Sequence, residues 1–119
     1  MSAARYITRR VMLGAFGALL LAAPLSAQQI SISGLYEAQG RNPDGSAYTG
    51  QAVISEANGA VQVNWTVGNQ RYSGTGVRDG QVVVVNWGQP APVIYVVMSN
   101  GDLYGTWENG TALERLVRQ

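Results

Sequence analysis

Few side chains in this sequence can do acid–base or nucleophilic chemistry. The chain contains no histidine, no cysteine and no lysine. These residue types supply the usual general base, the thiol nucleophile, amine chemistry and most zinc or copper ligands. Serines are present, but no imidazole is available to activate them. We therefore predict a protein that is not an enzyme, with no catalytic residues, no bound metal and no cofactor.

Carboxylates are the remaining acid–base groups, because a pair of acids can hydrolyse a glycosidic bond. The candidates are Glu37, Asp102, Glu108 and Glu114. Exposed acids near strand ends are usually solvated. A carboxylate-dependent hydrolase is therefore the least favoured function.

Oxygen-bearing side chains also crowd around a glycine at residues 42–46, Asn-Pro-Asp-Gly-Ser. A calcium loop of the helix–loop–helix type needs several acids or amides at alternate positions and a closing Glu. Asp44 is the only acid between Glu37 and Glu56. Pro43 at the second position of a turn, with positive φ at Gly45, fits the sequence better. We predict a hairpin turn here and no metal site.

Any such groups must be positioned by a series of short strands. Asn-Gly and Asp-Gly between apolar runs are strong hairpin signals, because glycine adopts positive φ without steric cost. Turn signals fall at 42–45, 57–59, 68–70, 78–80, 88–92, 99–102 and 108–110. They delimit eight expected strands, near 32–40, 47–55, 60–67, 70–77, 81–87, 92–98, 102–107 and 111–117. The short connections predict an all-β fold, an eight-stranded antiparallel up-and-down meander that closes into a small barrel, lipocalin-like in shape.

Apolar and polar residues alternate along several segments, as they do in strands with one buried face. Val61, Val63 and Trp65 share one face, while Gln62 and Asn64 share the other. Glycines recur on the apolar faces, where we expect aromatic rings to pack over the gaps. An eight-stranded barrel encloses at most a small ligand. The candidate interior ligand site comprises Tyr36, Trp65, Tyr72 and Trp107.

The segments 81–87 and 92–98 are apolar on both faces. β-branched residues suit any strand, so strand propensity alone can explain the pattern. The alternative is an exposed apolar patch that binds a partner or a second copy of the chain. The two prolines in the turn between the segments give it a stiff tip of low charge. The candidate interaction surface comprises Val83, Val85, Trp87, Pro90, Pro92, Ile94 and Val96.

The N-terminus predicts export. Arg5, Arg9 and Arg10 precede an apolar run at 11–23, and Ala27 offers a small residue at a cleavage point. This order is typical of a secretory signal peptide, on either the twin-arginine or the general secretion route. The run is shorter than the roughly 20 residues of a membrane span, so we expect no transmembrane segment. We predict a signal peptide at 1–27, one barrel domain at 28–119 and a periplasmic or secreted location.

Export would change the charge of the protein. Residues 28–119 hold five arginines and seven acidic residues, a net charge of −2. A domain without a basic cluster cannot neutralise many phosphates, so we expect no nucleic-acid partner. The absence of cysteine also rules out a disulfide framework, and a chain of this length can bury one modest core.

Four stretches carry a resemblance to other proteins: GLYEAQGRNPDGSAYTG, VNWTVGNQRYSGTG, VVNWGQPAPVIYVV and GDLYGTWENGTALERL. In this order they resemble small exported, largely uncharacterised β-proteins of alphaproteobacteria, some labelled fibronectin-binding. The resemblance covers about residues 33–117. It implies an exported β-protein and brings no catalytic residue or cofactor.

The residues leave three functional hypotheses. The leading one is an exported, non-enzymatic barrel that binds a protein or a cell-envelope component through its surface, alone or as a homodimer. The second is a carrier of a small hydrophobic ligand inside the barrel. The third is the carboxylate hydrolase.

Overall fold

The computed structural model describes residues 29–119, and the predicted signal peptide lies outside this range. The unit Ser31–Gln119 is an all-β barrel. Its strands are β1 (Gly34–Arg41), β2 (Ala47–Ala57), β3 (Ala60–Val67), β4 (Gln70–Asp79), β5 (Val82–Asn86), β6 (Val93–Val97), β7 (Leu103–Trp107) and β8 (Ala112–Arg118). Each expected strand is present, close to its expected bounds. Over residues 29–119 there is no helix with the length and apolarity needed to cross a membrane.

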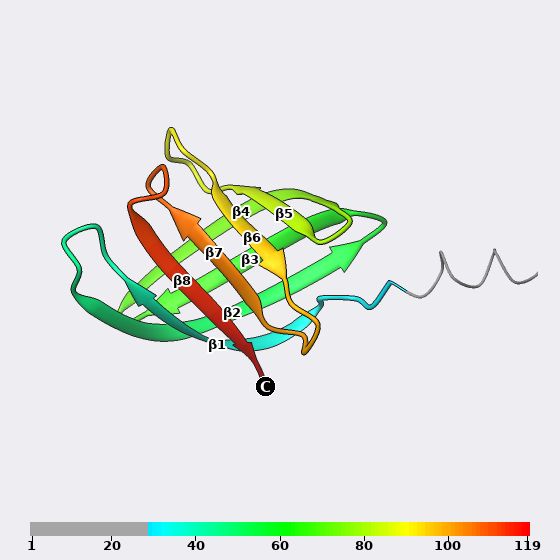
Figure 1. Ribbon diagram of the computed structural model, residues 1–119, viewed down its shortest axis with the longest axis horizontal. Coiled ribbons are helices and arrows are strands. Elements are labelled where there is room, and N and C mark those ends of the chain that lie inside the picture. Colours follow the sequence, from blue (N-terminus) through cyan, green and yellow to red (C-terminus); the bar gives the residue numbers. More distant parts are fainter. Residues whose placement is uncertain (1–28) are drawn as a thin grey trace, which may run out of the picture. The chain divides into compact units, whose positions relative to one another are not determined.

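Each strand pairs antiparallel with the next, and β8 pairs with β1, so the sheet closes into a barrel (Figure 1). The predicted fold class is confirmed. Closure leaves none of the eight strands of residues 29–119 with an unpaired edge that could recruit another chain. In this meander the turns after β1, β3, β5 and β7 lie at one end, which we call the mouth. The turns after β2, β4 and β6 lie at the other end, which we call the base.

Two turns show why the chain reverses where it does. Asn58 and Gly59 both have positive φ, 51° and 83°, and join Ala57 to its partner Ala60. This is the two-residue turn that Asn-Gly favours. At 42–46 the Asn42 N–H donates to the Ser46 carbonyl at 2.8 Å, and Gly45 has a φ of 91°. The hairpin predicted at 42–46 is confirmed.

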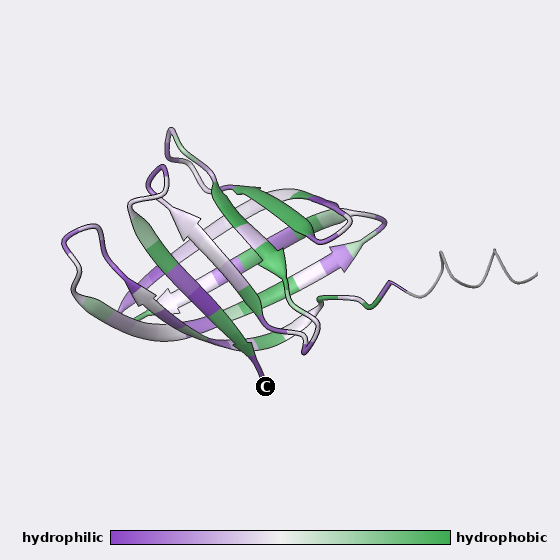
Figure 2. Ribbon diagram, in the orientation of Figure 1, coloured by the Kyte–Doolittle hydropathy of each residue, from purple (hydrophilic) through white to green (hydrophobic). Residues whose placement is uncertain are grey.

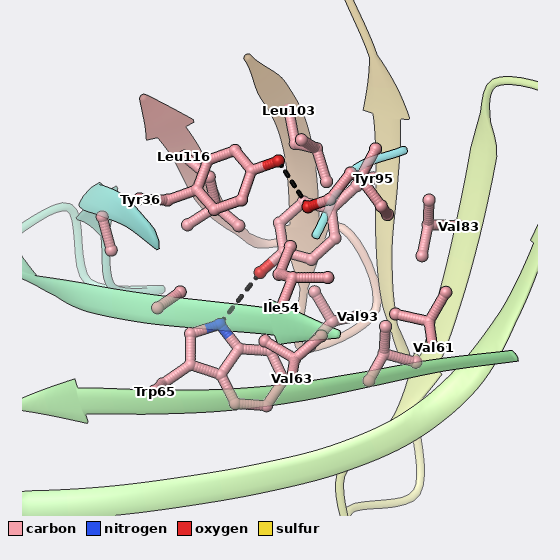
Figure 3. Packing of buried hydrophobic residues seen from close by; sticks show 14 residues of the cluster. Tyr36, Ile54, Val61, Val63, Trp65, Val83, Val93, Tyr95, Leu103 and Leu116 are labelled. Carbon is pink, nitrogen blue, oxygen red and sulfur yellow. Dashed lines mark hydrogen bonds between the residues drawn. The ribbon is translucent and has the colours of Figure 1, made fainter. Parts of the chain in front are cut away.

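The core lies inside the barrel and is built from inward-facing residues of every strand except β4, together with Ile32 before β1. The apolar face expected for Val61, Val63 and Trp65 is the buried face of β3. Tyr36 and Tyr95 are fully buried, and Figure 3 shows the Trp65 indole pointing toward the Tyr95 hydroxyl. The surrounding core residues are Ile32, Ala38, Ala52, Ile54, Val61, Val63, Val83, Val85, Val93, Leu103 and Leu116. Each buried Val, Leu or Ile stabilises the fold by about 1.5–3 kcal/mol relative to an exposed one.

Two inward glycines make room for tyrosine rings on the neighbouring strand. A Cβ atom at Gly40 would lie 2.1 Å from Cζ of Tyr48, its direct partner on β2. A Cβ atom at Gly105 would lie 2.5 Å from Cδ1 of Tyr95, its partner on β6. At these two pairs the expected packing of aromatic rings over glycine is confirmed.

The base of the barrel is closed by the residues just before β1. Ile32 is 2% exposed and belongs to the core. Its N–H donates to Oε1 of Glu56 at 2.9 Å, and its carbonyl accepts from the Tyr36 hydroxyl at 2.7 Å. Glu56 also pairs with Arg78 at 3.0 Å. We therefore look for solvent access to the interior at the mouth of the barrel.

Candidate functional site

An aromatic cavity of about 240 Å³ lies at the mouth. Strands β2, β3, β4, β6, β7 and β8 each position part of its wall, the turn after β1 adds Asn42, and the loop after β5 adds Trp87. All three tryptophans of the chain line it. The lining residues are Asn42, Tyr48, Trp65, Val67, Tyr72, Trp87, Val93, Trp107 and Glu114. Tyr72 is 40% exposed, so the cavity is in contact with solvent.

Glu114 lies at the inner side of this cavity and is only 7% exposed. β8 places it inward, opposite Gly40 on β1 and Gly105 on β7. Neither glycine carries a side chain, so the space beside the carboxylate is taken by the rings of Tyr48 and Tyr95. The same pairing that lets the rings pack therefore brings two hydroxyl groups to one carboxylate.

Two parallel chains of hydrogen bonds end on this carboxylate. Trp107 Nε1 donates to the Tyr48 hydroxyl at 3.0 Å, which donates to Oε1 of Glu114 at 2.7 Å. Trp65 Nε1 donates to the Tyr95 hydroxyl at 3.0 Å, which donates to Oε2. Trp65 also donates to Oε2 directly, at 3.1 Å. Three donors thus satisfy a buried carboxylate that would otherwise be costly to bury.

Burial and hydrogen bonding act in opposite directions on this group. Burial raises the pKa of Glu114 and is the larger effect, while the hydrogen bonds from Tyr95, Tyr48 and Trp65 lower it. The pKa values of Tyr48 and Tyr95 are raised, first by burial and then by the negative charge of Glu114. Both tyrosines are therefore protonated donors at neutral pH.

The aromatic rings pack edge to face around the cavity. The Trp87 ring is the centre of the group, 5.7 Å from Trp107, 6.0 Å from Tyr72 and 6.5 Å from Trp65 between ring centroids. The Tyr48 and Trp107 rings are 6.2 Å apart. The interplanar angles between neighbouring rings are 65–84°, so the rings bound the cavity in different directions. Trp87 Nε1 donates to the Ala91 carbonyl at 3.0 Å, which ties the loop after β5 to this wall.

The predicted interior site is only partly brought together. Trp65, Tyr72 and Trp107 line the mouth cavity. Tyr36 does not line it, because Tyr36 lies near the start of β1. There its hydroxyl donates to the Ile32 carbonyl and accepts from Arg118 Nη1 at 2.7 Å. Alternation predicts the face of a residue but not its height along the barrel, and Tyr36 lies toward the base.

The predicted interaction surface is wrong for Val83 and Val85, which are fully buried in the core. Directly paired residues of an antiparallel sheet share a face. Val83 pairs with the buried Tyr95, whereas Ile94 pairs with Val84. The predicted surface therefore combined residues from two opposite faces.

The other members of that predicted surface are distributed over different parts of the barrel. Trp87 lines the cavity. Pro90 is exposed and Pro92 half-buried in the loop after β5. Ile94 and Val96 do face outward, with 41% and 44% of their surface exposed.

The candidate acids do not form a pair. Glu108 is exposed in the turn after β7, and Glu37 is exposed on β1. Asp102 accepts a hydrogen bond from the Arg118 N–H at 3.0 Å. Among the described residues that line the mouth cavity, Glu114 is the only acid. The structure therefore brings together no pair of carboxylates around this cavity. Glu114 itself is buried rather than solvated, contrary to expectation.

Comparison with known proteins yields one structural likeness. No family model matches the chain, and no curated protein matches it. A redesigned β-barrel of known structure is similar, with a TM-score of 0.52 and 16% identity, over 74% of this chain and 91% of the other. At this identity the likeness shows the fold alone. It supports the barrel, and function must be argued from the site.

Sequence reasoning missed Glu114, Tyr48 and Trp87 as members of one site. Along β8 each face of the strand carries both apolar and charged residues, so alternation did not show that Glu114 points inward. Trp87 follows a strand that is apolar on both faces. The hairpin turn at 42–46 was a usable signal for Tyr48, because it sets the register that places Tyr48 opposite Gly40. Gly40 pairs with Glu114 on its other side, so β1 is the one strand between the two residues.

Proposed function

We propose that the protein binds a small molecule in the mouth cavity. The observation that supports this most is the buried carboxylate of Glu114 among three tryptophans and two tyrosines. A barrel core gains nothing from such a group, because a buried charge costs free energy even when it is hydrogen-bonded. Groups of this kind concentrate at functional sites.

The size of the cavity restricts the ligand. Drug-sized ligands occupy pockets of about 300–1,000 Å³, and this one measures about 240 Å³. The wall is apolar except for a few polar groups, which is typical of ligand sites. The ligand is therefore a compact molecule or the terminal group of a larger one.

A titration followed by ¹⁵N–¹H correlation spectra of the labelled protein tests this function. The probes are benzyl alcohol, choline and benzoate, which are neutral, cationic and anionic. We expect at least one probe to give saturable shifts of the Trp87 and Trp107 indole N–H signals. Unchanged indole signals with all three probes at millimolar concentration would reject the proposal.

A second candidate function is docking through the outer face of β4 to β8, because apolar side chains are exposed there on adjacent strands. Figure 2 shows that β5 and β6 are hydrophobic over most of their length, whereas β8 alternates. The exposed residues are Val77, Val82, Ile94, Val96, Tyr104 and Leu113. Ile94 and Val96 on this face belong to the interaction surface predicted from the sequence, so docking through this face stays a hypothesis. Sedimentation of the protein and of Val96→Lys tests self-association; a monomer in both cases would reject the homodimer.

A further inference from the structure

We propose that the ligand of the mouth cavity is a small organic cation, a quaternary or protonated amine that contacts the tryptophan rings and faces Glu114. This inference rests on the proposed function and specifies its ligand. It is carried by the charge of the cavity, by the donors around Glu114 and by the arrangement of the rings.

The charge of the cavity is negative. Glu114 is the only charged side chain among the described residues that line it. The arginines next to Asn42 and Glu114 in the chain are engaged elsewhere: Arg41 donates to the Gly45 carbonyl at 3.1 Å, and Arg115 lies over the Tyr104 ring on the outer face. An anionic ligand would meet a buried like charge without compensation. A cation would supply the counter-charge that the carboxylate lacks.

The hydrogen-bond donors fit the ionised form of Glu114. The Tyr48 and Tyr95 hydroxyls each accept from an indole N–H, which leaves their own protons free to point at the carboxylate. An ionised carboxylate accepts at both oxygens and has about four acceptor positions. Oε2 has two donors and Oε1 has one, so Oε1 keeps acceptor capacity for a ligand N–H.

The rings supply the second part of cation recognition. A cation is attracted to the face of an aromatic ring, most strongly to tryptophan. Trp65, Trp87 and Trp107 all line this cavity, and their steep interplanar angles give it walls in several directions. An enclosure of aromatic rings is a recurrent solution for alkylated ammonium groups.

A neutral apolar ligand fits these observations less well. It would exclude water from Glu114 and give no charge in return, which raises the cost of burying the carboxylate. An apolar carrier would be better served by an apolar residue at position 114. The charge at this position is what distinguishes the cavity from a simple hydrophobic pocket.

Calorimetric titration with three probes of similar shape tests the inference. Choline carries the positive charge, 3,3-dimethyl-1-butanol replaces the ammonium by carbon, and 3,3-dimethylbutanoate is an anion. We expect choline to bind about tenfold or more tightly than the alcohol, and the butanoate to bind most weakly. Glu114→Gln keeps the side-chain shape and should weaken choline binding about tenfold without weakening binding of the alcohol. Glu37→Gln, an exposed acid on β1, is the matched control and should change neither.

The outcomes separate the inference from the proposed function. Equal affinity for choline and the alcohol, with no effect of Glu114→Gln, would overturn the cation and leave the cavity a ligand site. Binding of none of the three would overturn both. The comparison of probes on the unaltered protein does not depend on the folding of any variant. Trp107→Phe gives a second test, since loss of the indole should weaken choline more than the alcohol.

Discussion

The Tyr48 hydroxyl donates a 2.7 Å hydrogen bond to Oε1 of Glu114, although the two residues are 66 positions apart in the chain. The same hydroxyl accepts from the Trp107 indole at 3.0 Å. One phenol therefore links β2 to β7 and β8 across the mouth. Because its ring occupies the space left by Gly40, the link depends on a strand pairing set by the turn at 42–46.

Replacing Tyr48 by Phe should destabilise the barrel by about 1–3 kcal/mol, the usual cost of leaving buried polar partners without a hydrogen bond. Both Glu114 and Trp107 lose a partner in this variant. Tyr104→Phe is the matched control, because Tyr104 is 43% exposed on the outer face, and it should cost less than about 0.5 kcal/mol. Urea denaturation measures both. Equal stability of the two variants would contradict a structural role for the hydroxyl of Tyr48.

The stability of the barrel should depend on pH through Glu114. Its pKa is raised by burial in the folded state, so its contribution is fully present below the unfolded pKa and is lost as pH rises through the folded pKa. The wild type should therefore lose stability relative to Glu114→Gln as pH rises from about 4.5, the ordinary pKa of a glutamate. The quantity to compare is the free energy of unfolding of the two proteins. The other titratable groups facing Glu114, Tyr48 and Tyr95, have raised pKa values and stay protonated.

Denaturation of both proteins between pH 4 and pH 8 measures this difference. Asp44 has the opposite dependence, because the Ser46 hydrogen bonds lower its pKa. Since both proteins contain Asp44, its contribution cancels. A difference that does not change with pH would show that the pKa of Glu114 is not raised by folding.

Gly40→Ala should disturb the site through the Tyr48 ring, because the new Cβ atom would lie 2.1 Å from Cζ of Tyr48. We expect a loss of about 1–3 kcal/mol in the free energy of unfolding, as is usual for overpacking. The cost should be smaller when Tyr48 is also changed to Ala, since the clash is then absent. Thermal or urea denaturation of the two single variants and the double variant gives the coupling. Additive effects would mean that the glycine and the ring do not interact.

Export remains a prediction from the N-terminal residues. Expression of residues 1–119 in a Gram-negative host should yield periplasmic or secreted protein whose first residue is Gln28, because Ala27 is the expected end of the signal peptide. Intact-mass measurement of each cell fraction tests this. A cytoplasmic protein that keeps residues 1–27 would contradict it.

The fold was predictable because its signals are local. Asn-Gly at 58–59 and Pro-Asp-Gly at 43–45 mark turns within a few residues, and alternation along β3 marks one inward face. The site was harder because it depends on register between strands. Alternation alone predicts that Trp65 points inward, while the position of Glu114 depends on the pairing of β8 with β1, which no local pattern reveals.

Both faces of β5 are apolar, which explains the error at Val83 and Val85. Valine is common at both inward and outward positions of strands, so its presence does not predict which face is buried. Only the pairing of Val83 with Tyr95 decides which face is buried.

A crystal structure of the protein grown with choline tests the cation site most directly. We predict the trimethylammonium group within contact distance of the Trp87 and Trp107 rings, on the side of the cavity that Glu114 lines. An empty mouth cavity at saturating choline, or choline bound only on the outer face of β4 to β8, would contradict the site.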